Sequence, residues 1–226
     1  MNNKIHPTCI IEGAVEIGKG NEIGPYSIIY GPTKIGDGNI IGPHVVIGTP
    51  GQDTREPRHD SSGAFIQIGN NNIIREFTAI QKPRYRDITR IGDDVFIMQS
   101  VHVPHDAVIS DGAVITPLVA MGGVVRIMKG ATLALGCSLH QFVVIGHYAF
   151  VAMEAAITRN VRPFVKYIPG GPVAVNDYAI KKHGLLGYKD EIDAYVLEGV
   201  EPRTPILLEL IREFELESTK SGRKTY

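Results

Sequence analysis

The large aliphatic residues of this chain recur every six positions over most of its length. The first series runs from Ile11 to Ile47, the second from Ile68 to Ile80, and the third from Ile91 to Ile157. An α-helix would show a period of about 3.6 and a single amphipathic strand a period of about 2. A period of six is typical of short strands joined by corners, so the pattern predicts an all-β solenoid, a parallel β-helix.

A second, smaller slot lies four residues after each large one. It holds small or β-branched side chains along most of the repeat, and asparagine at Asn21, Asn39 and Asn72. The hexapeptide pattern resembles the left-handed β-helix, in which three hexads make one coil, so residues about 18 apart stack at the spacing of neighbouring strands, about 4.8 Å.

Glycine often follows the large residue, which predicts tight corners that use its conformational freedom. These glycines are Gly18, Gly24, Gly36, Gly42, Gly69, Gly92, Gly122 and Gly146.

The repeat is interrupted at two places. Ile47 and Ile68 lie 21 residues apart with "GQDTREPRHDSSG" between them, and Ile80 and Ile91 lie 11 apart around "KPRYRD". A solenoid accommodates extra residues by extruding them at a corner, so both segments are predicted to be external loops. Loops held by a rigid scaffold are good candidates for function.

The hexads stop after Ile157, and the remaining sequence favours helices. "NDYAIKKHG" predicts a helix that closes on Gly184, and "TPILLELIREFELES" predicts one with Thr204 as N-cap and Pro205 at its first position. Its expected apolar face is Ile206, Leu207, Leu210, Ile211 and Phe214. We therefore predict a solenoid over residues 1–170 and a small α-helical domain over residues 171–226. The final "KSGRKTY" is expected to fray, although its basic residues could meet a phosphorylated carrier.

Two histidines stand out in "QSVHVPHDAVI", residues 99–109. Val101 and Val103 take the inward slots, so alternation turns His102 outward, and His105, at the following corner, also faces out. Residues 105, 123 and 141 stack in one column, which places Gly123 one coil above His105. A histidine base beside an accessible backbone N–H suits acyl transfer, and Asp106 could hold the imidazole tautomer.

Other interpretations of these residues stay open at this point. His105 could be a solvated surface histidine, and Asp106 a solvated carboxylate at a corner. Some hexapeptide β-helices are carbonic anhydrases that hold zinc with three histidines shared between subunits. His102, His105, His140 and His147 offer nitrogen ligands, but the characteristic spacing is absent, so no metal site is predicted. Cys137 falls in the small inward slot and is expected in the core.

Composition narrows the function classes further. A formal net charge of −1 and a pI near 6.7 give no electrostatic case for nucleic acid or an anionic membrane. No signal peptide and no membrane span are visible, and two cysteines are too few for a disulfide framework. We expect a soluble, cytoplasmic protein.

At "GNNNIIREFTAI", "HVPHDAVI", "LHQFVVIGHYAFV" and "NDYAIKKHG" the chain resembles the UDP-N-acetylglucosamine acyltransferase family of lipid A synthesis. The resemblance implies a homotrimer of left-handed β-helices with clefts between subunits. It also implies an acyl donor on a phosphopantetheine arm, coenzyme A or acyl carrier protein, and no permanently bound cofactor.

The resemblance also implies roles for individual residues. His105 matches the general base, Asp106 its orienting carboxylate, and Gly123 the glycine whose backbone N–H faces the oxyanion. Other positions match substrate contacts. These are Gln52 and Asp53 for the sugar, Arg55 in the same loop, His102, His140 and Gln141 in the cleft, Met153 at the acyl channel, and Asn176, Tyr178 and Lys182 near the nucleotide.

Several positions depart from the family pattern. Gln81 and Val124 stand where histidines are usual, Arg55 replaces a lysine, Tyr178 replaces an acidic residue, and Lys182 with His183 replaces two arginines. Met153 stands where a small residue would open the acyl channel, which favours a short acyl group. We therefore expect transfer of a short acyl group to a nucleotide-linked amino sugar, as N-acylation. The alternatives are the UDP-N-acetylglucosamine 3-O-acyltransferase of lipid A synthesis and a non-catalytic β-helix assembly module.

Overall fold

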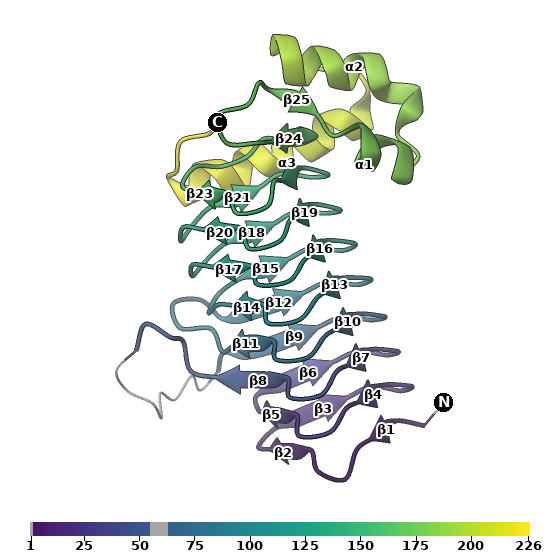
Figure 1. The fold of residues 1–226 in the computed structure, drawn as a ribbon, viewed down its shortest axis with the longest axis vertical. Coiled ribbons are helices and arrows are strands. Elements are labelled where there is room, and N and C mark those ends of the chain that lie inside the picture. Colours follow the sequence, from purple (N-terminus) through teal and green to yellow (C-terminus); the bar gives the residue numbers. More distant parts are fainter. Residues whose placement is uncertain (1, 55–62) are drawn as a thin grey trace.

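The computed structural model describes residues 2–54 and 63–226, and its main body is a stack of short parallel strands in three sheets (Figure 1). The first sheet contains β1 (Lys4–Ile5), β4 (Glu22–Ile23), β7 (Ile40–Ile41), β10 (Ile73–Ile74), β13 (Phe96–Ile97), β16 (Val114–Ile115), β19 (Thr132–Leu133), β22 (Phe150–Val151), β24 (Val165–Tyr167) and β25 (Ala174–Val175). The second contains β2 (Ile10–Glu12), β5 (Ile28–Tyr30), β8 (Val46–Thr49), β11 (Ala79–Gln81), β14 (His102–Val103), β17 (Ala120–Met121), β20 (Ser138–Leu139) and β23 (Ala156–Ile157). The third contains β3 (Val15–Ile17), β6 (Thr33–Ile35), β9 (Phe65–Ile68), β12 (Ile88–Ile91), β15 (Val108–Ile109), β18 (Arg126–Ile127) and β21 (Val144–Ile145).

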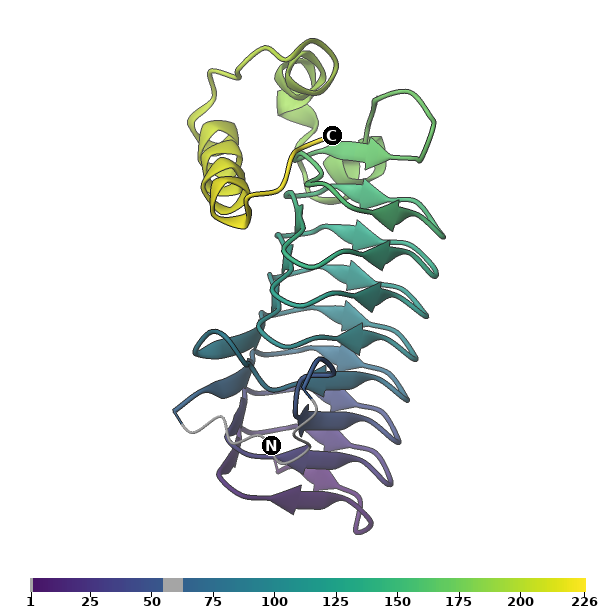
Figure 2. The ribbon, with the colours of Figure 1, turned by 90° about the vertical axis from the view of Figure 1, so that its left-hand side faces the viewer.

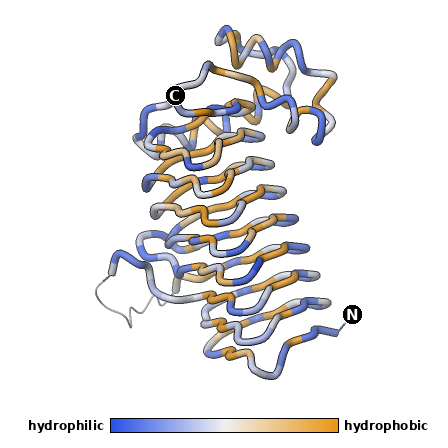
Figure 3. Tube along the Cα trace, in the orientation of Figure 1, coloured by the Kyte–Doolittle hydropathy of each residue, from blue (hydrophilic) through white to orange (hydrophobic). Residues whose placement is uncertain are grey.

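The register of these strands confirms the predicted vertical stacking. His102 pairs with Ala120, and Ala120 with Ser138, so neighbouring coils are 18 residues apart. All described strand pairs are parallel except β24 with β25. Hydrophobic positions follow the coils in Figure 3, and the large slot lies in the buried core from Ile23 to Ile157, whereas Ile11 in the first coil is 38% exposed. The left hand and the trimer remain implications of the family resemblance.

Both interruptions leave the coil at the same corner, between the second and third sheets. The first connects β8 to β9 and the second connects β11 to β12. The pairing of β6 with β9 and of β9 with β12 continues across them. The second insertion and the described ends of the first, residues 50–54 and 63–64, therefore lie outside the coil, as predicted (Figure 1). Residues 55–62 lie outside the described residues.

The glycines after the large slot serve a different purpose from the one predicted. None of the eight lies in the left-handed region of φ. A Cβ atom at Gly24 would lie 2.7 Å from the backbone nitrogen of Pro43, and one at Gly122 would lie 2.4 Å from that of Gln141. These glycines are needed because adjacent coils approach too closely for a side chain. The left-handed positions fall two residues later and hold residues such as Leu118 and Val124.

The asparagines in the small slot form a buried ladder. The side-chain oxygen of Asn21 accepts a hydrogen bond from the backbone N–H of Asn39, and that of Asn39 accepts one from Asn72. Asn72 in turn accepts one from Val95. Each amide thus satisfies a backbone donor on the next coil that would otherwise be buried without a partner.

The C-terminal region contains the two predicted helices and three short turns of helix. The elements are α1 (Asp177–Lys182), η1 (Leu186–Tyr188), α2 (Lys189–Asp193), η2 (Ala194–Glu198) and α3 (Pro205–Ser221). Thr204 precedes α3, but its side chain makes no cap and instead donates to Glu191 Oε1. Leu207, Ile211 and Phe214 form the buried face of α3, whereas Ile206 is exposed, contrary to the prediction. The domain boundary at residue 170 stays a prediction.

The C-terminal tail is docked, so the expectation that it frays was wrong. Figure 2 shows it crossing back from α3 to the coil. Thr225 forms a β-bridge with Asn160, and the ring of Tyr226 lies 4.4 Å from that of Tyr167, measured between centroids. Among the described residues, no helix is long and apolar enough to cross a membrane.

Candidate active site

His105 lies at the corner between β14 and β15, the same corner at which the two insertions leave the preceding coils. Val101 and Val103 fill the core, as predicted, and the imidazole of His105 points away from it. Only 4% of His105 is exposed, however, because the loop residues cover it. The alternative of a solvated surface histidine is therefore wrong.

The carboxylate of Asp106 orients this imidazole. Asp106 Oδ2 lies 2.7 Å from His105 Nδ1, which fixes the proton on Nδ1 and leaves the lone pair on Nε2 free to accept one. Asp106 is fully buried, so it is not the solvated corner carboxylate considered above. Its φ of 61° is left-handed, a region that aspartate tolerates better than most residues.

Asp106 also anchors the second loop. Its carboxylate accepts hydrogen bonds from the backbone N–H groups of Arg84, Tyr85 and Arg86, at 3.1, 3.1 and 2.8 Å. Burial alone would raise the pKa of Asp106, but the hydrogen bonds from His105 and from these amides outweigh it and lower the pKa. The carboxylate therefore stays ionised, and the loop over residues 82–87 is held against the corner that carries His105.

The imidazole of His105 lies between two glycines. A Cβ atom at Gly123 would lie 2.4 Å from His105 Nε2, and one at Gly51 would lie 3.1 Å from Cδ2. Val124 N–H donates to the carbonyl of His105, and Phe142 N–H to that of Gly123, which confirms the predicted column. In the part of the chain that the structure describes, the Gly123 N–H has no hydrogen-bond partner.

Asp53, from the first loop, reaches the same nitrogen. Its Oδ1 lies 3.6 Å from His105 Nε2 and 2.8 Å from Arg84 Nη1, and its Oδ2 accepts a hydrogen bond from Tyr85 Oη at 2.9 Å. Partial burial raises the pKa of Asp53, whereas the contacts with Arg84 and Tyr85 lower it, and the net direction is downward. Sequence reasoning missed Arg84 and Tyr85. The only signal was that "KPRYRD" interrupts the repeat.

Gln52 lies next to Asp53 and is exposed. Its backbone N–H donates to Gln81 Oε1 at 3.2 Å, so Gln81, where the family pattern has histidine, supports the first loop. His102 is half-buried on β14, where burial lowers its pKa, and its Nε2 has no partner among the described residues. Arg55 lies outside the described residues.

His140 and Gln141 lie at the same corner, one coil above Gly123, and both are exposed. Arg223 of the docked tail contacts His140 Nδ1 and donates from Nε to the carbonyl of Gln141 at 3.1 Å. Arg223 of the tail therefore lies beside the column that contains His105. Cys137 is fully buried, as predicted, and burial raises the pKa of its thiol to about 12.

The predicted nucleotide and acyl contacts lie elsewhere on the chain. Asn176 caps α1 and donates from Nδ2 to the carbonyl of Tyr148, so its amide is engaged within the fold. Tyr178 and Lys182 are exposed on α1, and Met153 is 67% exposed at the corner between the first and second sheets. A single chain does not bring these residues to His105, and their roles stay predictions.

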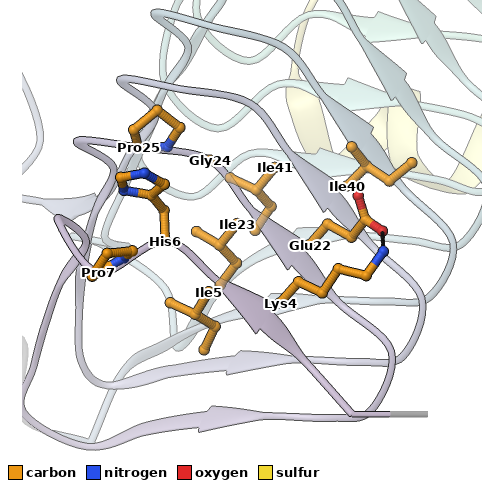
Figure 4. A pocket seen from close by; sticks show the side chains of 10 residues that line it. All are labelled: Lys4, Ile5, His6, Pro7, Glu22, Ile23, Gly24, Pro25, Ile40 and Ile41. Carbon is orange, nitrogen blue, oxygen red and sulfur yellow. Dashed lines mark hydrogen bonds and ion pairs between the residues drawn. The ribbon is translucent and has the colours of Figure 1, made fainter.

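Another hollow lies at the N-terminal end of the first sheet (Figure 4), lined by the first coils and by the exposed ion pair of Lys4 with Glu22. It is open and shares no residue with the His105 site. Within the described residues, no three His, Cys, Asp or Glu side chains come together to hold a metal ion.

Known proteins share this fold and parts of this sequence. The family model "Bacterial transferase hexapeptide (six repeats)" matches residues 14–49. The acyl-[acyl-carrier-protein]–UDP-N-acetylglucosamine O-acyltransferase of Gloeothece citriformis is 36% identical over 180 residues, covering 78% of this chain and 57% of that protein. That of a Synechocystis species is 36% identical over 167 residues, covering 74% and 52%. The chain resembles the UDP-N-acetylglucosamine acyltransferases.

Solved structures of such acyltransferases have the same fold. The enzyme of Bacteroides fragilis superposes with a TM-score of 0.71 at 23% identity, covering 99% of this chain and 98% of that one. The enzyme of Moraxella catarrhalis superposes with a TM-score of 0.66 at 25% identity, covering 98% of each chain. The chain spans a little more than half the length of the curated acyltransferases it matches, at 57% and 52%.

Proposed function

We propose that this protein transfers an acyl group from a thioester donor to a nucleotide-linked sugar, with His105 as general base. The observation that carries the proposal is the buried His105–Asp106 pair against Gly123, whose N–H has no partner among the described residues. The acyltransferases it resembles are named for an acyl carrier protein donor and UDP-N-acetylglucosamine. Those names favour O-acylation, which the sequence left as the alternative. They favour it over N-acylation, which we expected from the departures of this chain from the family pattern.

The geometry supports a direct transfer. The acceptor hydroxyl gives its proton to His105 Nε2 while its oxygen attacks the thioester carbon, and the Gly123 N–H donates to the oxyanion that forms. Collapse of this intermediate expels the thiolate, which takes the proton from the imidazolium, and the ester and free thiol leave. General base catalysis contributes about 10²–10⁴ in rate, and one oxyanion donor about 10²–10³.

N-acylation of an amino sugar remains a second candidate. It is favoured by the exposed Tyr178 in place of an acidic residue and by Met153 in place of a small one. Under either acceptor, we propose that Asn176, Tyr178 and Lys182 contact the nucleotide and that Met153 limits the acyl chain. Coenzyme A and acyl carrier protein are cytoplasmic donors, so the reaction would take place in the cytoplasm.

We further propose that the protein is a homotrimer with the site in a cleft between subunits. The outer face of the first sheet carries a column of apolar side chains that includes Ile40 and Ile73, which are 47% and 38% exposed. Phe96 and Val114 continue it, and Phe150 follows after Thr132. A cyclic trimer would bury this column against the next subunit, because heterologous contacts can close into a ring. Light scattering should then give three times the mass of one chain.

The function is tested by assaying acyl-carrier-protein and coenzyme A thioesters of several chain lengths against UDP-N-acetylglucosamine and a nucleotide-linked amino sugar. Turnover with the hydroxyl acceptor supports O-acylation, and turnover confined to the amine supports the second candidate. His105→Ala should lower kcat by at least about 10² with an unchanged circular dichroism spectrum. Near-normal turnover in this variant would remove the base assignment. If no donor or acceptor raises the melting temperature, the non-catalytic assembly module is favoured instead.

A further inference from the structure

The carboxylate of Asp53 is held from two sides by consecutive residues of the second loop. Arg84 Nη1 lies 2.8 Å from Oδ1, and Tyr85 Oη donates to Oδ2 at 2.9 Å. The Arg84 guanidinium lies over the Tyr85 ring at 5.1 Å, and that ring meets the imidazole of His105 edge-on at 5.5 Å between centroids. Oδ1 thus has an ion-pair contact and Oδ2 a hydrogen bond, and the two together orient the carboxylate.

The orientation leaves a defined gap beside the base. Asp53 Oδ1 and His105 Nε2 are 3.6 Å apart, which is too long for a direct hydrogen bond. Both atoms are acceptors when His105 is neutral, because its proton is on Nδ1. Two acceptors at this separation match two donor groups on adjacent ring carbons of a sugar, one for each atom.

We infer that Tyr85 is a positioning residue, which with Arg84 sets Asp53 to bind the donor group next to the acylated one on the acceptor sugar. The inference rests on the proposed function and deepens it. The hydroxyl that reacts donates to His105 Nε2, and the neighbouring hydroxyl or amide donates to Asp53 Oδ1. An acceptor without that second donor leaves the lone pair of Asp53 Oδ1 that faces His105 without a hydrogen bond, which weakens binding.

A purely structural role for the Tyr85 hydroxyl is poorly supported by its surroundings. Tyr85 is 64% exposed, and its loop is already fixed by three backbone hydrogen bonds to Asp106. The hydroxyl adds only the bond to Asp53, which reaches across from the first loop. Its removal should therefore alter the site and leave the fold and the loop in place.

The test is Tyr85→Phe, which keeps the ring against His105 and removes only the hydroxyl. We expect KM for the acceptor to rise about fivefold to tenfold, the scale of one partly exposed hydrogen bond to a charged group, with kcat changed less than about threefold. Loss of this donor raises the pKa of Asp53, so the acid limb of the kcat/KM profile moves to higher pH. Arg84→Gln should move the acid limb of this profile further toward higher pH.

Tyr26→Phe is the matched control, because Tyr26 is similarly exposed at a different corner.

A second measurement separates this inference from the proposed function. Carbon-13 NMR of the Asp53 carboxylate follows its titration without any substrate, and the Asp53 pKa should be higher in Tyr85→Phe than in the parent or in Tyr26→Phe. If that shift occurs while no acyl transfer is found, the proposed function fails and the positioning of Asp53 stands. If acyl transfer is found but Tyr85→Phe changes neither KM, the pH profile nor the titration, the positioning role is overturned.

Discussion

Replacing Gly123 with alanine should cost activity and leave the solenoid folded. A Cβ atom at this position would lie 2.2 Å from Cε1 and 2.4 Å from Nε2 of His105. The backbone does not oppose the change, because Gly123 is not among the residues with positive φ. The three atoms nearest to that Cβ all belong to the imidazole of His105, so the imidazole has to move.

The size of that movement follows from the contacts. Ordinary van der Waals contact for a Cβ atom begins at 3.4 Å, so the ring must retreat by about 1 Å, a displacement that can cost about 10²-fold in rate. Retreat is opposed by Asp106, whose Oδ2 lies 2.7 Å from Nδ1. The free energy of unfolding should change by less than about 1 kcal/mol, since alanine at a compatible φ restricts the unfolded chain and offsets part of the strain.

The assay measures kcat for acyl transfer and the urea midpoint of unfolding for Gly123→Ala. The same two quantities are measured for two control variants, Gly122→Ala and Gly187→Ala. Gly122→Ala would place its Cβ 2.4 Å from a backbone nitrogen of the next coil, so it should lower stability. Gly187→Ala meets nothing within 4 Å and has no positive φ, so it should alter neither quantity. Full activity in Gly123→Ala, or a loss of stability matching that of Gly122→Ala, would refute the reasoning.

Two further predictions concern stability. Asp106→Asn should lower the free energy of unfolding at pH 7 by about 2 kcal/mol, because an ionised acceptor for buried donors is lost. The pKa of Asp106 is lowered in the fold, so its contribution is complete above the unfolded value of 3.8 and is lost as pH falls through the folded pKa. Urea unfolding of both proteins should therefore converge in acid, and a constant difference would contradict this. Leu118→Gly should raise stability by up to about 1 kcal/mol, because Leu118 has a φ of 62°. Leu135→Gly, exposed at the same corner without a positive φ, should lower stability, and equal effects would count against backbone strain.

The parts of the fold that depend on period were predictable from the sequence. The stacking of His105 beneath Gly123 and the extrusion of both loops follow from counting residues, because a solenoid fixes which positions share a column. The helix near residue 177 was predictable from Gly184 after its end, and the one near residue 205 from Pro205 at its first position, although Thr204 does not cap it. Such features are local, or repeat at a fixed interval, so one sequence contains enough information.

The parts that depend on contacts between distant segments were not predictable. The burial of His105 comes from loops whose conformation no repeat specifies, and Arg84 and Tyr85 gain their roles only through contact with Asp53. The docked tail was missed for the same reason, since the Thr225–Asn160 bridge spans distant positions. The corner glycines were identified correctly, but the reason predicted for them was wrong. The distance that requires glycine lies between adjacent coils, and it cannot be read from the sequence of one coil.

Asp106 connects the regular and the irregular parts of this site. One of its oxygens orients His105, whose position is set by the solenoid, while the carboxylate also binds three amides of the second loop. That loop carries Arg84 and Tyr85, which hold Asp53 of the first loop. The base and the residues that we propose select the acceptor are therefore fixed to one buried carboxylate. A change in loop sequence can alter acceptor recognition through Asp53 without moving the base, provided that the backbone donors to Asp106 remain. The family resemblance implies a histidine at the position of Gln81 and a shared His105–Asp106 pair and Gly123, and this arrangement is compatible with both.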